Sequence, residues 1–251
     1  MMSEVSIIIP TLNEQFFLPK ILSSILGQKF KGRLEVIVVD GESEDKTLEV
    51  AQSFRGKFNF LRVFKAKRGV YPQRNLGARV AKYRHLLFLD ADITLPPGFL
   101  NRFAAKIESD ERAIHFALHL TPGFNPLDYL LLFNIYSFML FSWLFGNPIT
   151  SGSFTLTTKE NHRKVGGFDN RAIMGGDVDY LWRSKRDGAA YHFHFWPHVY
   201  VSPRRARKEG RLGLLYKWLK CYFYMKRSGH PVYSKSAVLY TYGDYLLREQ
   251  I

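Results

Sequence analysis

The sequence predicts an α/β fold with a mostly parallel central sheet and helices on both faces. Short, almost continuously apolar runs alternate with longer amphipathic segments through the first 120 residues. The runs are rich in β-branched and aromatic residues, and most end at Pro, Gly or Asp, as strands do. Strands apolar on both sides and separated by helices are typical of a parallel sheet covered on both faces.

The individual elements follow from this alternation. Strands are predicted over 5–9, 34–39, 60–64, 85–89 and 113–118. Helices are predicted over 18–28, 45–54, 72–83 and 97–108. Pro72 and Pro97 fall near the first turns of two of these helices, where a missing N–H costs little.

Composition narrows the class of protein. At 251 residues and 46% hydrophobic, the chain can bury one large core. The net charge of +14 implies an anionic partner: nucleic acid, a phosphorylated small molecule or an acidic membrane face. A single cysteine, Cys221, excludes an internal disulfide framework. The N-terminus has no basic leader and only a strand's length of apolar residues, so we expect a cytoplasmic protein.

Polar clusters follow three of the predicted strands, at 10–14, 40–47 and 90–92. Ligands of such folds bind beyond the carboxyl ends of strands, although each cluster alone is also a common turn sequence. Asp90 and Asp92 stand two residues apart and can point into one pocket, or can cap the turn that follows. Together with phosphate oxygens they suit a hard cation such as Mg2+ or Mn2+.

Six motifs resemble family 2 glycosyltransferases, the inverting nucleotide-sugar enzymes of the GT-A fold. In order, they are SIIIPTLNE, VIVVDGESEDKT, QRNLGA, FLDAD, VGGFD and GGDVDYLWR. The resemblance runs from about Val5 to Arg183. It implies a Rossmann-like GT-A fold, a UDP- or GDP-linked sugar donor, a divalent metal (Mg2+ or Mn2+) and transfer of one sugar with inversion.

The resemblance implies roles for donor-side residues. Thr11 and Glu14 would lie against the nucleoside, and Asp40 would accept from its base. Arg74 would lie close to the nucleotide, where a cation can offset phosphate charge, and Asp90 near the ribose. From the residues alone, each also has a structural interpretation: Asp40 could be a turn residue, and Arg74 could be a cation on the surface of a helix.

The remaining implied roles concern the metal and the acceptor. Asp92 would hold the metal on the diphosphate, and Asp177 would act as general base. The family usually has Glu-Asp here, whereas this chain has Gly176 before Asp177; Asp177 alone could also be a simple helix cap. Gly152 and Asp179 are expected on the acceptor side.

Basic residues later in the chain extend this side. The segment 202–210 looks like a basic stretch of the family, and Arg204 and Arg205 would contact a phosphorylated substrate or remain surface charges. We therefore divide the chain into a nucleotide-sugar-binding half (1–120), an acceptor-side half (121–203) and a basic, aromatic C-terminal segment (204–251).

Two segments suggest a lipid surface. Residues 126–146 are apolar enough to span a bilayer, yet a span there would separate Asp92 from Asp177. We expect an interfacial, re-entrant or buried helix, or a homodimer contact, at the cytoplasmic face of a membrane. The segment 204–227 is basic and aromatic and suits either an anionic surface or the core. Together they favour a glycan or lipid-linked acceptor.

Other functions fit less well. A catalytically inactive nucleotide-sugar-binding protein would share every motif. A nucleic-acid-binding protein would explain the charge, but no recognition motif is present, so we expect no nucleic acid. A dinucleotide-dependent oxidoreductase should show G-x-G-x-x-G where PTLNE stands. His192, His194 and His198 invite a zinc interpretation, but without a clear further ligand they are expected to be structural or acceptor-lining.

Overall fold

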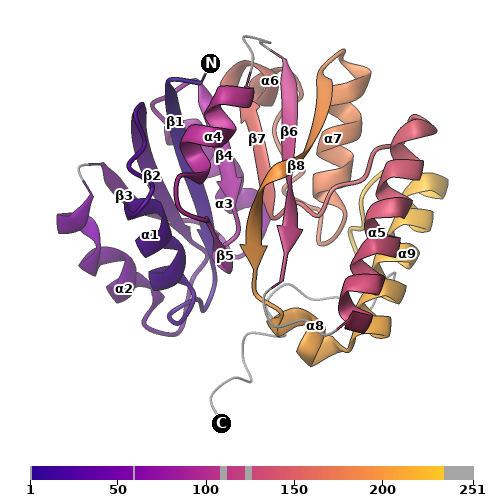
Figure 1. Ribbon diagram of the computed structural model, residues 1–251, viewed down its shortest axis with the longest axis horizontal. Coiled ribbons are helices and arrows are strands. Elements are labelled where there is room, and N and C mark those ends of the chain that lie inside the picture. The colour runs from indigo at the N-terminus through magenta and orange to yellow at the C-terminus, as the bar shows by residue number, and fades with distance from the viewer. Residues whose placement is uncertain (1, 59, 108–111, 122–125, 235–251) are drawn as a thin grey trace.

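The computed structural model describes residues 2–58, 60–107, 112–121 and 126–234. Within them one eight-stranded sheet forms the centre, in the order β3-β2-β1-β4-β7-β6-β8-β5 (Figure 1). The strands are β1 (Glu4–Thr11), β2 (Arg33–Asp40), β3 (Leu61–Lys65), β4 (His85–Leu89), β5 (Ile93–Thr94), β6 (Ala113–Leu120), β7 (Phe154–Thr158) and β8 (Ala190–Val201).

Helices flank this sheet. They are α1 (Leu18–Leu26), α2 (Thr47–Ser53), α3 (Val70–Val80), α4 (Phe99–Lys106), α5 (Pro126–Leu144), α6 (Lys159–Lys164), α7 (Gly176–Arg186), α8 (Arg204–Glu209) and α9 (Arg211–Ser228), with the 3-10 turn η1 (Arg55–Lys57). The five strands and four helices predicted in the first half are confirmed, within a few residues at each end.

The sheet is covered on both faces, as its apolar strands predict. Alternate strand residues face opposite sides, so Ile7 and Ile9 join one buried cluster while Ile8 joins the other. The first cluster includes residues of α1, α2 and α4, and the second includes residues of α3 and α7. The predicted mostly parallel α/β fold is confirmed.

Three antiparallel pairings distinguish the second half. Strands β1 to β4 pair in parallel, whereas β7 lies antiparallel between β4 and β6. Strand β8 then pairs in parallel with β6 and antiparallel with the short β5. The strand β5 was not among the predicted strands. The sheet therefore contains strands from both predicted halves of the chain, 1–120 and 121–203.

Two long helices lie side by side at one end of the molecule (Figure 1). Residues 126–146, predicted as an apolar helix, form α5, and Phe138 of α5 contacts Tyr222 of α9 with ring centroids 5.5 Å apart. The basic segment 204–227 forms α8 and α9, separated by Gly210 at a φ of 74°. Across the described ranges, no helix is both long and apolar enough to cross a bilayer.

Three histidines stack where β6 meets β8. His115 lies with its ring centroid 4.9 Å from that of His192 and 5.3 Å from that of His194. The His115 Nδ1 and His194 Nε2 atoms are 3.1 Å apart, a hydrogen bond that needs at least one neutral ring. Burial, aided by the neighbouring histidines, lowers the pKa of His115 to about 3.

We predict that this stack makes the protein acid-sensitive. The pKa of His115 is lower in the folded than in the unfolded state, so the unfolded protein binds a proton at this histidine first as the pH falls. The free energy of unfolding is therefore unaffected by His115 above about pH 6.5 and decreases as the pH falls from there toward 3. Urea unfolding should show that His115→Phe loses less stability between pH 7 and pH 5 than the wild type, by up to about 2 kcal/mol. Equal losses in the two proteins would contradict this account.

Candidate active site

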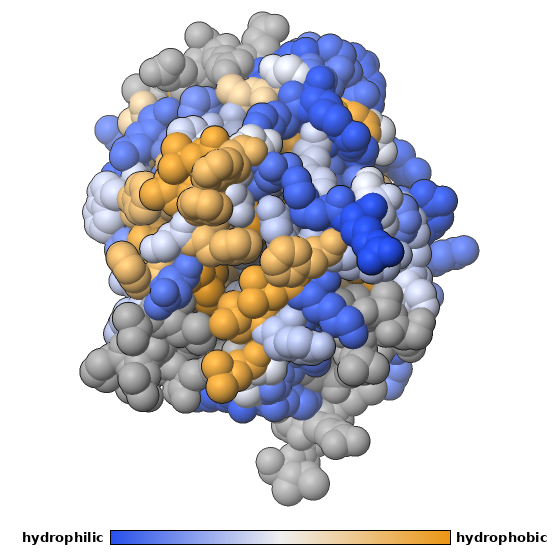
Figure 2. Space-filling model, turned by 90° about the vertical axis from the view of Figure 1, so that its right-hand side faces the viewer, coloured by the Kyte–Doolittle hydropathy of each residue, from blue (hydrophilic) through white to orange (hydrophobic). Residues whose placement is uncertain are grey.

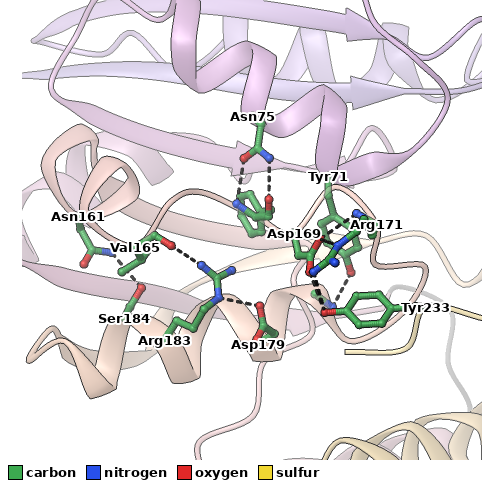
Figure 3. Close-up of polar contacts among 12 residues, drawn as sticks. Tyr71, Asn75, Asn161, Val165, Asp169, Arg171, Asp179, Arg183, Ser184 and Tyr233 are labelled. Atoms are coloured by element: carbon green, nitrogen blue, oxygen red, sulfur yellow. Dashed lines mark hydrogen bonds and ion pairs between the residues drawn. The ribbon is translucent and has the colours of Figure 1, made fainter. Parts of the chain in front are cut away.

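Helix α3 carries a face that contacts the second half of the chain. Tyr71, Arg74 and Asn75 stand three and four residues apart and therefore lie on one side of the helix. The Asn75 side chain donates to the Phe168 carbonyl at 2.7 Å and accepts from the Phe168 N–H at 2.9 Å (Figure 3). Gly77 lets α3 approach the sheet, because a Cβ there would lie 2.3 Å from Ile8 Cγ2.

The guanidinium of Arg74 joins carboxylates from both halves. One nitrogen donates to Asp90 Oδ1 at 2.7 Å and to the Gly152 carbonyl at 2.9 Å, and the other donates to Asp177 Oδ1. The Arg74 side chain is 2% exposed, whereas that of Asp90 is 33% and that of Asp177 18% exposed. The two carboxylates are thus partly exposed to solvent, while the cation that joins them is buried.

Burial and the neighbouring charges together set the protonation of this cluster. Burial alone would lower the pKa of Arg74, but the charges of Asp177 and Asp90 raise that pKa above its ordinary value and keep the guanidinium protonated. Burial also raises the pKa of the Asp177 carboxyl, and Arg74 opposes part of that rise. A carboxylate with a raised pKa is a better proton acceptor than an ordinary aspartate.

A second ion cluster brings the C-terminal segment to the end of β1. Arg204 donates to both Glu14 carboxylate oxygens, at 2.8 and 2.5 Å, and its Nε lies 3.3 Å from Asp92 Oδ2. Burial, opposed by Arg204, raises the pKa of Glu14 to about 7. Burial and the charge of Asp90 likewise raise the pKa of Asp92 against the effect of Arg204.

The ends of β1 and β2 form a third polar cluster. Asp40 is fully buried; its Oδ1 is 3.5 Å from Thr11 Oγ1, and its Oδ2 accepts from the Ser43 N–H at 3.0 Å. Gln73 of α3 donates to the Thr11 and Val39 carbonyls at 2.6 and 3.0 Å. These contacts hold the carboxyl ends of the two strands together beside α3.

A pocket of about 190 Å³ borders the second cluster. Its lining includes Phe17, Lys20, Asp92, Tyr200 and Pro203. The described part of the chain contains no group of three His, Cys, Asp or Glu side chains that could hold a metal ion by themselves. A cation at Asp92 would therefore need oxygen ligands from a substrate as well.

Asp179 lies apart from these clusters, whereas Arg205 is near enough to the second cluster for its charge to lower the pKa of Asp92. Asp179 accepts from Arg183 Nε at 2.8 Å, and Arg183 also donates to the Val165 carbonyl (Figure 3). Arg205 pairs with Glu209 at 3.1 Å, one turn along the same segment. Their acceptor-side roles stay predictions, as do the roles of the other site residues.

Tyr71 also belongs to the site, although no motif in the sequence predicts this. Its hydroxyl accepts from the Gly176 N–H at 2.9 Å and donates to Asp177 Oδ2 at 3.3 Å. A Cβ at position 176 would lie 2.5 Å from the Tyr71 ring. The Tyr71 ring therefore fills the space beside residue 176, where the family usually has a glutamate.

Gly152 is constrained in the same way. Its φ is 74°, and a Cβ there would lie 2.3 Å from the Asp177 carboxyl group. Its carbonyl accepts from Arg74, so the peptide serves as a ligand of the guanidinium. Tyrosine and glycine are common residues, so the sequence gives no specific sign that Tyr71 contacts Asp177 or that the Gly152 carbonyl contacts Arg74.

Comparison with known proteins identifies the family. The family model described as glycosyl transferase family 2 matches residues 6–166. The chain belongs to glycosyl transferase family 2. The predicted family and enzyme class are thereby confirmed.

Curated relatives of this family 2 chain are glycosyltransferases. Glycosyltransferase AglE of Haloferax volcanii is 27% identical over 83% of this chain and 69% of its own length. A PGL/p-HBAD biosynthesis glycosyltransferase of Mycobacterium bovis is 41% identical over 42% of each chain. The poly(ribitol-phosphate) β-N-acetylglucosaminyltransferase TarS of Staphylococcus aureus is 33% identical over 43% of this chain, but only 19% of TarS is covered.

Solved structures share the fold. Mannosyltransferase PcManGT of Pyrobaculum calidifontis, solved with GDP-Man and Mn2+, matches 91% of this family 2 chain and 65% of its own, with a TM-score of 0.68 and 20% identity. S. aureus TarS 1-349 matches 85% of this chain and 65% of its own, with a TM-score of 0.63 and 21% identity. The chain thus spans about two thirds of these solved neighbours.

We predict that a methyl group at position 176 disturbs the site. Gly176→Ala should displace the Tyr71 ring and weaken its hydrogen bond to Asp177, lowering the free energy of unfolding by about 1–3 kcal/mol. Gly213→Ala is the matched control, because nothing lies within 4 Å of the Cβ position there. Urea midpoints measure both variants, and an unaffected Gly176→Ala would contradict the close contact.

Removing Arg204 should leave a buried carboxylate without its cation. We predict that Arg204→Leu lowers the free energy of unfolding by about 3–5 kcal/mol, and that adding Glu14→Gln restores part of the loss. Arg205→Gln breaks a more exposed pair and should cost under about 1 kcal/mol. Similar urea midpoints for Arg204→Leu and Arg205→Gln would contradict this assignment.

Proposed function

We propose that this protein transfers one sugar from a nucleotide-sugar donor to an acceptor hydroxyl with inversion at the anomeric carbon. The observation that carries the proposal is the pair of partly exposed carboxylates, Asp90 and Asp177, held on one buried guanidinium at the carboxyl edge of the sheet. Family membership supplies the reaction class. The activity and substrates of the whole protein are part of the proposal.

The donor is a UDP- or GDP-linked sugar bound over the ends of β1, β2 and β4. In support, TarS 1-349 was solved with UDP-GlcNAc, and PcManGT with GDP-Man. The buried Asp40 carboxylate, aligned by Thr11 and Ser43, suits a base N–H. Because uracil and guanine both offer such a donor, either nucleotide fits this chemistry.

Asp92, with Asp90 beside it, would hold Mg2+ or Mn2+. The residues present fit a hard cation, because both offer carboxylate oxygens and the charge of Asp90 raises the pKa of Asp92. When bound, the cation would offset the negative charge that develops on the departing nucleoside diphosphate. Arg204 already neutralises part of the charge of Asp92 and Glu14.

Asp177 would accept the proton of the attacking hydroxyl. Its position in the first turn of α7 favours the charged form, while burial raises its pKa toward the range of a general base. Tyr71 and Arg74 bind its two oxygens and so hold the carboxylate in one orientation. The acceptor is a glycan or a lipid-linked molecule that approaches from the side of α7.

Two substitutions should separate donor binding from transfer. We predict that Mn2+ with at least one UDP- or GDP-sugar raises the melting temperature of the wild type, because a ligand of the folded state stabilises it. Asp92→Ala should lose the metal-dependent part of this shift. Asp177→Asn should keep the shift and lose at least about a hundredfold in turnover, the scale of general-base catalysis.

The exposed carboxylate Glu49 on α2 offers a control, since Glu49→Gln should change neither the shift nor turnover. No shift with any nucleotide sugar would contradict the donor assignment. A normal shift without turnover in the wild type would indicate a nucleotide-sugar-binding protein rather than an enzyme. Full turnover by Asp177→Asn would place the base elsewhere.

A further inference from the structure

Helix α5 carries an apolar stripe on its outer side. Phe133, Leu140 and Leu144 are 69%, 50% and 67% exposed. Their spacings of seven and four residues place them on one side of the helix. Ser142, on the opposite side, is buried. The helix therefore turns apolar side chains toward solvent, unlike an ordinary surface helix.

Helix α9 repeats this pattern beside it. Leu212, Tyr216 and Phe223 are 78%, 63% and 63% exposed and are spaced by four and seven residues. The side turned half a turn away is buried through Leu214, Cys221 and Met225. We call the two outer stripes together the α5–α9 face.

The α5–α9 face is rich in aromatic side chains. Phe141, Trp143 and Phe145 are also exposed on or next to α5. Figure 2 shows hydrophobic residues gathered on this side of the molecule, with hydrophilic residues around them. Apolar patches of this kind with a polar rim mark interaction surfaces, and Trp and Tyr favour the boundary between membrane and water.

Cations border the α9 stripe on both sides. At about 100° per residue, Lys226 lies on one side of the stripe and Lys220 and Arg227 lie on the other, each within about a sixth of a turn of its centre. Arg227 is exposed and Lys220 is half-buried. The whole chain carries a net charge of +14. An apolar stripe between cations suits a surface that is both apolar and anionic.

We propose that the α5–α9 face binds an anionic lipid bilayer, with both helices lying along its surface. Apolar side chains would enter the boundary between headgroups and acyl chains, while Lys220 and Arg227 would lie at the level of the phosphates. Lys226 donates to Asn147 Oδ1 at 2.7 Å and adds its charge at the edge of the face. This mode of binding needs no membrane-spanning helix.

Charge favours lipid over a second copy of the chain. In a two-fold dimer the same surface meets itself, so the cations beside one α9 would approach those of the other. Like charges brought together at the edge of an apolar contact oppose association. Anionic headgroups instead attract every cation on this border. The described side chains therefore complement a phospholipid surface better than they complement themselves.

The α5–α9 face is joined to the candidate active site through the core. Cys221 and Met225 on the inner side of α9 pack with Val178 and Trp182 of α7. The first turn of α7 carries Asp177. This packing would hold the candidate active site at a fixed height above the bilayer. If the protein is the glycosyltransferase of the proposed function, a lipid-linked acceptor would be presented at that height. The binding of lipid does not itself depend on catalysis.

Vesicle flotation tests the proposal. The full chain is mixed with vesicles of equal parts phosphatidylglycerol and phosphatidylcholine, or of phosphatidylcholine alone. We expect strong binding to the anionic vesicles in about 0.1 M salt and partial release in about 1 M salt, where the Debye length falls from about 10 Å to about 3 Å. The fraction that stays bound at high salt should be released by detergent.

Variants separate the apolar and ionic parts. Combining Phe133→Ser, Leu212→Ser and Phe223→Ser should raise the half-saturating lipid concentration at least about tenfold. Phe60→Ser, at a phenylalanine before β3 that is 55% exposed, is the control and should change the half-saturating lipid concentration less than about twofold. Combining Lys220→Gln and Arg227→Gln should weaken binding to the anionic vesicles but not to the phosphatidylcholine vesicles. The remaining binding to anionic vesicles should depend less on salt.

Three outcomes would overturn the proposal: a wild type that ignores anionic vesicles, a triple serine variant that binds as well as the wild type, or a stable lipid-free dimer that the same variant dissociates. Sedimentation equilibrium detects the dimer. The nucleotide-sugar melting shift, measured on each variant, should be unchanged. It therefore distinguishes a failure of lipid binding from a failure of the proposed function.

Discussion

The buried guanidinium of Arg74 constrains the whole site. A charge removed from water needs opposite charges and hydrogen-bond acceptors around it, and leaving one uncompensated costs several kcal/mol. Arg74 obtains them from Asp90 after β4, from Asp177 on α7 and from the Gly152 carbonyl. Because these groups come from both halves of the chain, the two halves must close on α3 before the cation can be buried.

The small residues near this cation follow from the same constraint. Asp177 can reach Arg74 only if residue 152 has no side chain, and the Tyr71 ring fits only if residue 176 has none. In place of the usual Glu-Asp motif, this chain has Gly176 before Asp177. In this chain a tyrosine on α3 contacts Asp177 and fills the adjacent space.

Much of the fold was predictable because local patterns determine it. The apolar runs identified β1 to β4 and β6, and the carboxyl ends of these strands located Asp40, Asp90 and Asp92. The two-residue β5 has no pattern of its own and exists only because β8 lies beside it. The contacts of Tyr71 with Asp177 and of Arg204 with Glu14 join residues 106 and 190 positions apart, and no local signal encodes such pairings. Family resemblance located Asp177 but could not reveal the ring that supports it.

The position of Arg204 has a consequence for synthesis on the ribosome. Strands β1 to β4 emerge first and can pair early, since their partners are close in the sequence. The end of β1, however, gains its buried cation only when residue 204 has left the ribosome, and α7 gains its packing against α9 later still. A nascent chain therefore carries the paired strands β1 to β4 beside an unfinished site until α8 and α9 have been made.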